Sequence, residues 1–173
     1  MADQFPILKR IADAVIERAQ LNLGVYRTIR TRDGKTRKRR AVSSGNLQKS
    51  LSYTIRSSKT TFKILFGADG DAANYFRVVN DGRAAGKRQP PVDPIIKWMR
   101  QKPVRLRNDK GFVKQTEEGI RGVAFAIARS IGKNGIEPYP YYSDAINHVV
   151  QEMDETIKND LQKELDAYLK TWQ

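Results

Sequence analysis

Residues 135–142 read GIEPYPYY, and this stretch separates the body of the chain from its last predicted helix. Each proline in it fixes its φ angle at about −65°, so an extended entry into the helix is expected. Tyr139, Tyr141 and Tyr142 add a large aromatic area at the same place. We predict a structural hinge here, and the alternative is that these three tyrosines lie in a subunit interface.

The last segment, residues 141–172, is predicted to form one long amphipathic helix. Its apolar residues recur at steps of three and four, which places them in a single stripe. They are Ile146, Val149, Val150, Met153, Ile157, Leu161, Leu165, Tyr168, Leu169 and Trp172. About 30 helical residues would span on the order of 45 Å, so we expect part of the helix to pack on a sheet and the remainder on a neighbouring subunit.

Another amphipathic helix is predicted near the beginning of the sequence. Apolar residues from Phe5 to Ala19 recur at helical spacing. Asp3 can cap this helix and Pro6 is tolerated in its opening turn, and the helix is expected to end near Gly24.

Residues 25–42 predict a basic β-ribbon. Two strands flank Asp33-Gly34, a dipeptide favoured in two-residue hairpin turns because both positions accept positive φ. Because polar residues alternate along these strands, the ribbon can bury little apolar surface. We expect it to be mobile or to pack against a partner.

Charge is distributed unevenly over the 173 residues, whose net charge is +13. Residues 26–59 hold eleven basic residues and one acidic residue, whereas residues 136–173 hold three basic and eight acidic residues. A basic body with an acidic terminal helix suits association with a polyanion. It equally suits head-to-tail association between copies of the chain.

An antiparallel sheet is predicted within residues 51–80. The motif Ser43-Ser44-Gly45-Asn46 has the chemistry of a turn and a helix cap, before a short helix at 47–51. Residues 52–56 and 61–66 are rich in β-branched and aromatic residues and predict a hairpin. Residues 75–79 predict a third strand.

Residues 84–135 read as an insertion on this sheet. Asp93 and Pro94 suit the start of a helix, a small hairpin follows, and a further helix is expected from about Thr116 to Ile131. The predicted fold class is therefore α+β, with an antiparallel sheet packed against long N-terminal and C-terminal helices. At 173 residues we expect a single domain, 1–173.

Composition restricts the class of protein. Hydrophobic residues make up 39% and charged residues 29% of the chain, and cysteine is absent. No apolar run approaches the roughly 20 residues that span a bilayer, and the start lacks the pattern of a signal peptide. We expect a soluble, intracellular protein with no membrane partner.

Catalytic and metal-binding patterns are weak. His148 is the only histidine, and we predict a packed or solvated helix residue. Asp69-Gly70-Asp71 begins like a calcium loop but lacks its later ligands, so a turn is predicted. Ser43 and Ser44 have no candidate base nearby. The clustered carboxylates of the last helix fit a solvated face. We therefore predict that the protein is not an enzyme and that it binds no metal, cofactor or small-molecule substrate.

The run Arg37-Lys38-Arg39-Arg40 is the strongest local charge feature. It is either an exposed basic strand that keeps the protein soluble, or an arm that contacts DNA phosphates or an acidic patch on a partner. The residues predicted to make that contact are Arg30, Arg32, Lys35, Arg37, Lys38, Arg39 and Arg40. No aromatic interleaving or recognition-helix pattern indicates base reading.

Three segments together resemble a known family. Residues 42–51 (VSSGNLQKSL), 75–83 (YFRVVNDGR) and 135–142 resemble, in this order, motifs of the neck or tail-completion proteins that join head and tail in tailed bacteriophages. The sequence departs from the motifs at Ser43, Ser44, Asn80 and Glu137.

The resemblance implies a structural virion protein. Copies would form a homo-oligomeric ring in the neck, between the portal or head-closure ring and the tail, around the DNA passage. Assembly would take place in the host cytoplasm. Beyond the tyrosines, we predict Glu155, Asp160 and Trp172 at the subunit interface. The alternative is a nucleic-acid-binding accessory protein that uses the ribbon at 26–40.

Overall fold

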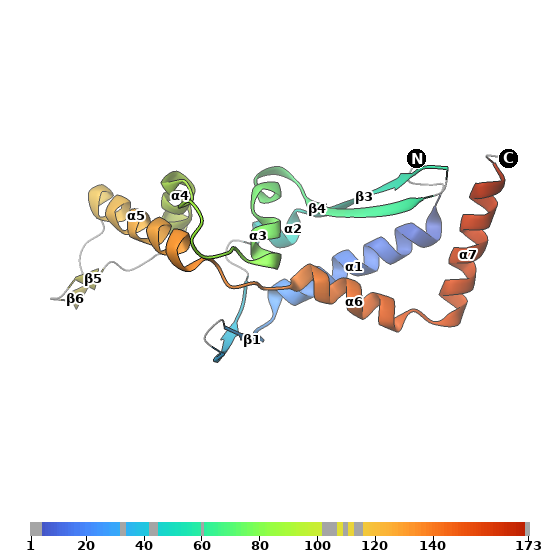
Figure 1. The fold of residues 1–173 in the computed structure, drawn as a ribbon, viewed down its shortest axis with the longest axis horizontal. Coiled ribbons are helices and arrows are strands. Elements are labelled where there is room, and N and C mark those ends of the chain that lie inside the picture. The colour runs from blue at the N-terminus through green and yellow to red at the C-terminus, as the bar shows by residue number, and fades with distance from the viewer. Residues whose placement is uncertain are drawn as a thin grey trace. The chain divides into compact units, whose positions relative to one another are not determined.

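A computed structural model gives the fold (Figure 1) and describes residues 5–31, 34–41, 45–59, 61–101, 107–108, 111–112 and 116–171. The chain forms two compact units. Unit 1 comprises Met1–Asn80 and Tyr139–Gln173, and unit 2 comprises Asp81–Pro138. The sequence predicted one domain with an insertion at 84–135, whereas the contacts within the chain make that region a compact unit of its own.

Unit 1 contains the predicted first helix, α1 (Pro6–Gly24). Pro6 occupies its first turn, where a backbone N–H would have no helical partner. The chain becomes extended at Val25, so the predicted end at Gly24 is confirmed. Asp3, the predicted cap, lies outside the described residues. The buried face of α1 consists of Leu8, Ala12, Val15, Ala19, Asn22 and Leu23.

The predicted hairpin is confirmed as β3 (Leu51–Ser57) paired antiparallel with β4 (Phe62–Ala68). It follows the short helix α2 (Asn46–Lys49), which begins after Gly45. Because side chains alternate along a strand, one face of the hairpin carries Tyr53 opposite Phe66. The Tyr53 hydroxyl donates to Asp13 Oδ1 of α1 over 2.8 Å, so this face covers α1.

The predicted third strand is wrong. After a 3₁₀ turn (Gly70–Asn74), residues 76–81 form a helix, α3 (Phe76–Asp81). Phe76 and Val79, three residues apart, both pack on the core of unit 1, and Asn80 is buried beside them. In a strand, Phe76 and Val79 would lie on opposite faces and could not both reach the core. Tertiary packing therefore favours a helix here, despite the β-branched composition of the segment. The sheet therefore has two strands.

The predicted long terminal helix is two helices, α6 (Tyr141–Glu152) and α7 (Glu155–Lys170). Met153 is extended, and the Asp154 side chain caps α7 by accepting from the Ile157 N–H at 2.8 Å. α6 packs along α1, which Figure 1 shows between α6 and the hairpin. Sequence periodicity missed the break because neither glycine nor proline marks it.

The basic ribbon is present as β1 (Arg27–Arg30) and β2 (Thr36–Arg39), paired antiparallel. Arg27 lies opposite Arg39, and Thr28 lies opposite Lys38. The predicted two-residue turn is wrong, because Arg30 lies opposite Thr36 and the Thr31 N–H donates to the Lys35 carbonyl oxygen at 2.7 Å, a register that needs a longer connection. Gly34, in that connection, has φ +78°, as expected for the glycine of a three-residue hairpin loop. Asp33 lies outside the described residues.

Unit 2 is a helix pair, α4 (Val92–Gln101) and α5 (Glu117–Asn134), with short strands β5 (Arg107–Asn108) and β6 (Gly111–Phe112) between them. Thr116 caps α5 by accepting from the Gly119 N–H at 3.1 Å. The buried core described for this unit is small: Met99, Ile120 and Ala124, with partly buried aliphatic side chains around them.

Two glycines allow the segments that begin and end unit 2 to approach each other. Arg83 and Ile136 exchange two backbone hydrogen bonds of 2.9 Å. Gly82 has φ +73°, and a Cβ there would lie 2.6 Å from the Ile136 carbonyl oxygen. Gly135 also has φ +73°, and its Cβ would overlap the Arg83 carbonyl oxygen. Both positions therefore require glycine.

The predicted α+β fold class is confirmed, with three separate two-stranded sheets in the described residues. Within the same residues, every helix is too short or too polar to cross a bilayer.

Candidate interaction surfaces

The tyrosines of the 135–142 stretch lie in the core of unit 1. Tyr139 and Tyr141 are fully buried and Tyr142 is 5% exposed. Their assignment to a subunit interface is therefore wrong, because burial within one chain leaves these side chains no surface for a second copy. The alternative prediction, a structural role at the entry to the last helices, fits this placement.

Hydroxyl groups fix these buried rings to the backbone. The Tyr139 hydroxyl lies 2.9 Å from the Asn22 carbonyl oxygen, and the Tyr142 hydroxyl donates to the Gly67 carbonyl at 2.7 Å. Burying a hydroxyl without a hydrogen-bond partner is unfavourable. These bonds therefore favour the observed end of α1 and the observed position of β4. Burial raises the pKa of both phenols, and for Tyr139 nearby guanidinium groups partly oppose that rise.

Asn80, in the segment 75–83, forms hydrogen bonds that connect this segment to the start of α6. Its Oδ1 accepts from the N–H groups of Tyr142 (2.9 Å) and Ser143 (3.3 Å), at the first turn of α6. Its Nδ2 donates to the Ser143 hydroxyl at 2.9 Å. This buried amide therefore caps α6 from a distant part of the sequence. Leu47 and Leu51, from the first family-like segment, lie in the same core.

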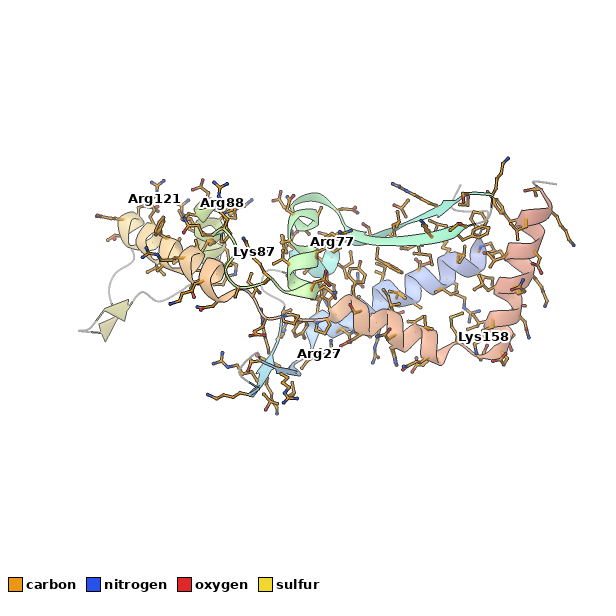
Figure 2. The ribbon with its side chains drawn as sticks, viewed as in Figure 1. Arg27, Arg77, Lys87, Arg88, Arg121 and Lys158 are labelled. Carbon is orange, nitrogen blue, oxygen red and sulfur yellow. The ribbon has the colours of Figure 1, made fainter. Side chains whose placement is uncertain are left out.

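The inner face of the basic ribbon is held by the protein itself. Arg27 forms an ion pair with Asp144 of α6, and its guanidinium lies 5.6 Å from the centre of the Tyr139 ring (Figure 2). Like charges placed directly opposite on a sheet repel, as Arg27 and Arg39 do here. Asp144 offsets part of that repulsion. Arg39 is only half-exposed and is less accessible to a partner than predicted.

The outer face of the ribbon is open. Arg30 and Lys38 lie on the face opposite to Arg27, and both are exposed. Arg37, Lys35 and Arg40 are exposed as well. Arg32 lies outside the described residues. We name the exposed set Arg30, Lys38 and Arg40 the outer basic face; Arg37, opposite Ile29 and two residues from Arg39, belongs to the face of Arg27.

Sequence reasoning missed an exposed aromatic residue beside this face. Tyr26 directly precedes β1 and is 73% exposed. Leu21 and Val25, at the end of α1, are also about half exposed, at 53% and 51%. The signal was available, because Tyr26 keeps the two-residue period of Thr28 and Arg30 on the outer face.

Helix α7 carries four acidic and three basic residues, so it is less acidic than the predicted terminal helix as a whole. Glu155 pairs with Lys158 at 2.7 Å (Figure 2) and Asp160 pairs with Lys163 at 3.2 Å, both within the helix. Such exposed pairs contribute little to stability and leave the carboxylates accessible. Trp172, the other predicted interface residue of this segment, lies outside the described residues.

One carboxylate of α7 has a structural role that the sequence did not indicate. Glu164 accepts from the Ile7 N–H at 2.7 Å and from the Leu8 N–H at 3.3 Å. It therefore caps the first turn of α1, where free N–H groups favour a negative charge. The prediction of a solvated face is wrong for this residue.

The remaining candidates for chemistry have structural partners. His148 lies 3.2 Å from Glu152, one turn away in α6. Asp69 accepts from the Ser52 hydroxyl at 2.8 Å at the predicted turn. In the part of the chain that the structure describes, no group of three or more His, Cys, Asp or Glu residues is arranged to hold a metal ion. Ser43 and Ser44 lie outside that part.

A shallow groove lies between the two helices of unit 2. Asp93 and Lys97 of α4 line it opposite Glu118 and Arg121 of α5, so its charges are mixed. At one end Arg100 pairs with Glu117 at 2.6 Å. Mixed, exposed charges of this kind fit a solvated helix pair.

Comparisons of the chain with protein-family models, with curated proteins and with solved structures found no match.

Proposed function

We propose that this protein is a non-enzymatic structural component of a tailed-bacteriophage virion. Copies form a ring in the neck that joins the portal or head-closure complex to the tail and surrounds the DNA passage. Unit 1 provides the contacts between neighbouring copies.

The observation that carries this proposal is the presence of two unlike surfaces on unit 1. The outer basic face lies on the β1–β2 ribbon, and the carboxylates of Glu155, which is exposed, and Asp160, which is half-exposed, lie on α7. A ring closes by heterologous contacts, in which one face of a subunit meets a different face of the next. Opposite charges on separate elements of one chain supply such faces.

The family-like segments add support. All three contribute to one core, through Leu47 and Leu51, Asn80, and Tyr139 to Tyr142. Segments that resemble one family and pack together act as a single structural scaffold. Glu137, at a motif position where the family has a basic residue, is half-buried in unit 2.

Charge exchange tests the ring. Reversing the outer basic face (Arg30→Glu with Lys38→Glu) should abolish assembly, and so should reversing α7 (Glu155→Lys with Asp160→Lys). Combining both reversals in one chain should restore assembly, because the faces are again complementary. Electron microscopy and light scattering measure the rings, and Arg56→Glu with Lys63→Glu on the hairpin is the matched control. Failure of the combined variant to assemble, with the fold intact, would contradict the proposal.

Particle composition tests the virion assignment separately. When particles are produced in host cells, the protein should be found by mass spectrometry in purified virions with tails attached. Withholding the protein should leave heads and tails unjoined. Joined particles without the protein would exclude the neck role even if rings form in isolation.

A second candidate function is nucleic-acid binding by the same ribbon. The observation that favours it is Tyr26, exposed beside the outer basic face. An aromatic ring next to cations can stack on an unpaired base while the cations contact phosphates. Binding should weaken steeply with salt.

Affinity measurements separate this function from the ring. Arg30→Gln, Lys38→Gln and Arg40→Gln together should abolish binding of a fluorescent oligonucleotide, whereas Arg56→Gln with Lys63→Gln should change it little. Tyr26→Ala should weaken binding to single strands by roughly tenfold and binding to duplex DNA far less. Assemblies that survive nuclease treatment, together with unchanged affinity in Tyr26→Ala, would exclude this candidate.

A further inference from the structure

Helix α7 packs within unit 1 through a partly buried face that includes Ile157, Leu161 and Leu165. None of its described residues is buried. Glu164 caps α1, and the Tyr168 ring packs edge-on against Phe5 and Phe62, with centroids 5.0 and 4.9 Å apart. The Tyr168 hydroxyl also lies 3.1 Å from the Ser57 hydroxyl. We name the surface that receives α7 the docking site. It consists of Phe5, Ile7, Leu8, Ser57 and Phe62.

The connection between α6 and α7 is short and carries no residue that forbids a helix. Only Met153 and Asp154 separate the two helices, and residues 141–170 contain neither glycine nor proline. The apolar stripe continues through the break, from Val149 to Met153 and on to Ile157. One side chain, that of Asp154, caps α7 and favours the bent form.

We propose that α7 exchanges between copies of this chain. The hinge at Met153 and Asp154 straightens, α6 and α7 become one continuous helix, and α7 occupies the docking site of a second copy. Each contact with the docking site is kept, now between chains, while the hinge gains helical hydrogen bonds. The occupant is a second copy because the docking site already fits this helix: it supplies ring partners for Tyr168 and free N–H groups for Glu164.

The geometry of exchange permits closed assemblies. If each copy gives its α7 to the next, the contact is heterologous and can close into a ring; if two copies exchange mutually, a dimer results. Exchange does not depend on a virion role. It would hold for a protein of unit 1 architecture in any setting.

Two hinge variants should shift the equilibrium between the bent form and the continuous helix in opposite directions. Glu155→Pro places proline at the first position of α7, which the bent form tolerates. In a continuous helix the same proline clashes with the carbonyl of the preceding turn and disfavours straightening by roughly a hundredfold or more. Asp154→Ala removes the cap and disfavours the bent form by about fivefold.

Light scattering across a concentration series measures the result. Asp154→Ala should shift association to lower concentration than in the unaltered chain, by about fivefold for a large ring and about 25-fold for a mutually exchanged dimer in which two hinges straighten, and Glu155→Pro should remain monomeric. Asp166→Ala, which removes an exposed carboxylate of α7 that is not assigned to the ring interface, is the control and should behave as the unaltered chain. Equal association of the Asp154→Ala and Glu155→Pro variants would overturn the proposal.

Cross-linking identifies the exchanged helix directly, because the chain has no cysteine of its own. Thr171 lies one turn beyond Tyr168, whose hydroxyl contacts Ser57. A chain with both Ser57→Cys and Thr171→Cys should be joined internally by a short bismaleimide. A mixture of the two single variants should give a two-chain product only if α7 crosses between copies.

The outcomes are decisive and separate from those of the proposed function. A two-chain product that disappears when Glu155→Pro is added to both single variants supports exchange. Absence of the product, while the double variant is joined internally, overturns it. Finding that purified virions lack the protein would exclude the neck role, but it would not change the cross-linking result.

Discussion

The cores of the two units differ in how they are fixed. In unit 1, large tyrosine side chains are buried and their hydroxyl groups bond to backbone carbonyls of α1 and β4. In unit 2, the core described by the structure is a few aliphatic residues and Met99 between two helices, and glycines set the approach of its end segments. Directional hydrogen bonds specify one arrangement of unit 1, whereas unit 2 depends on close backbone packing. Substitutions should therefore act differently in the two units.

The largest effect is expected from Tyr139→Ala in unit 1. Removing this fully buried ring leaves a cavity and should lower the free energy of unfolding by about 3–5 kcal/mol. That is a large part of the roughly 5–15 kcal/mol that stabilises a typical domain. Tyr139→Phe keeps the ring but removes the hydroxyl, and should cost about 1–3 kcal/mol. Denaturant unfolding followed by circular dichroism measures the free energy of unfolding of both variants. Equal losses of stability in the two would show that the hydroxyl, and not the ring, accounts for the destabilisation.

A smaller and more local effect is expected from Met99→Ala in unit 2. This substitution should cost about 2–5 kcal/mol, because Met99 is 3% exposed and has few buried neighbours to close the cavity. The loss should be confined to unit 2. Hydrogen exchange should accelerate in α4 and α5 and stay slow in α1. Equal acceleration in α1 would mean that the units unfold together, which would remove the distinction between them.

The importance of close backbone packing is tested by a pair of glycines. Gly82 and Gly86 both have φ +73°, but only at Gly82 would a Cβ meet neighbouring backbone atoms. Each alanine substitution carries the left-handed penalty of about 1–2 kcal/mol. Gly82→Ala should cost roughly 1–3 kcal/mol more, because backbone must move. Thermal unfolding compares the two variants, and equal melting temperatures would show that the contact with Ile136 can relax.

The smallest effect concerns a hydroxyl at the edge of unit 1. Burial, together with the hydrogen bond to Asp13, raises the pKa of Tyr53 from 10.0 to about 12. The folded state therefore holds this proton more tightly than the unfolded state. The resulting stabilisation is complete below about pH 10 and is lost as the pH rises toward 12.

Replacing that hydroxyl measures its contribution. Tyr53→Phe should cost about 0.5–1.5 kcal/mol at neutral pH, and the difference from the unaltered protein should shrink between about pH 10 and pH 12. The matched control is Tyr26→Phe, because Tyr26 is exposed. A difference that is constant over this pH range would mean that the bond to Asp13 does not form in solution.

Local periodicity predicted much of the fold. The first helix, the β3–β4 hairpin and the helix before Gly135 follow from regular apolar spacing and from capping residues such as Thr116. Residues 75–79 were misread as a strand because of their β-branched and aromatic composition, whereas Phe76 and Val79 both pack on the core of unit 1, as residues three apart do on one face of a helix. The break at Asp154 was missed because an N-cap aspartate within an acidic helix looks like one more solvated carboxylate.

Candidate surfaces were predicted less completely than the fold. Charge counting found the ribbon, but the sequence could not show that Arg27 and Arg39 lie on the inner face while Arg30 and Lys38 lie on the outer face. The strand register decides that division. The tyrosines at 139–142 were misplaced for a similar reason, because a large amphipathic ring suits an interface and a core equally well, and only contacts distant in sequence distinguish them.

The bond between Glu164 and the start of α1 has a consequence for synthesis. Ile7 and its capping carboxylate are 157 residues apart in the chain. At roughly 5–20 residues per second, a ribosome makes Glu164 about 8 to 30 seconds after Ile7. During that interval the first helix has neither this cap nor the Tyr168 ring that packs on Phe5. A chain stalled before residue 164 would therefore lack these contacts at the first turn of α1, and that turn should be more open to proteases than in the finished protein.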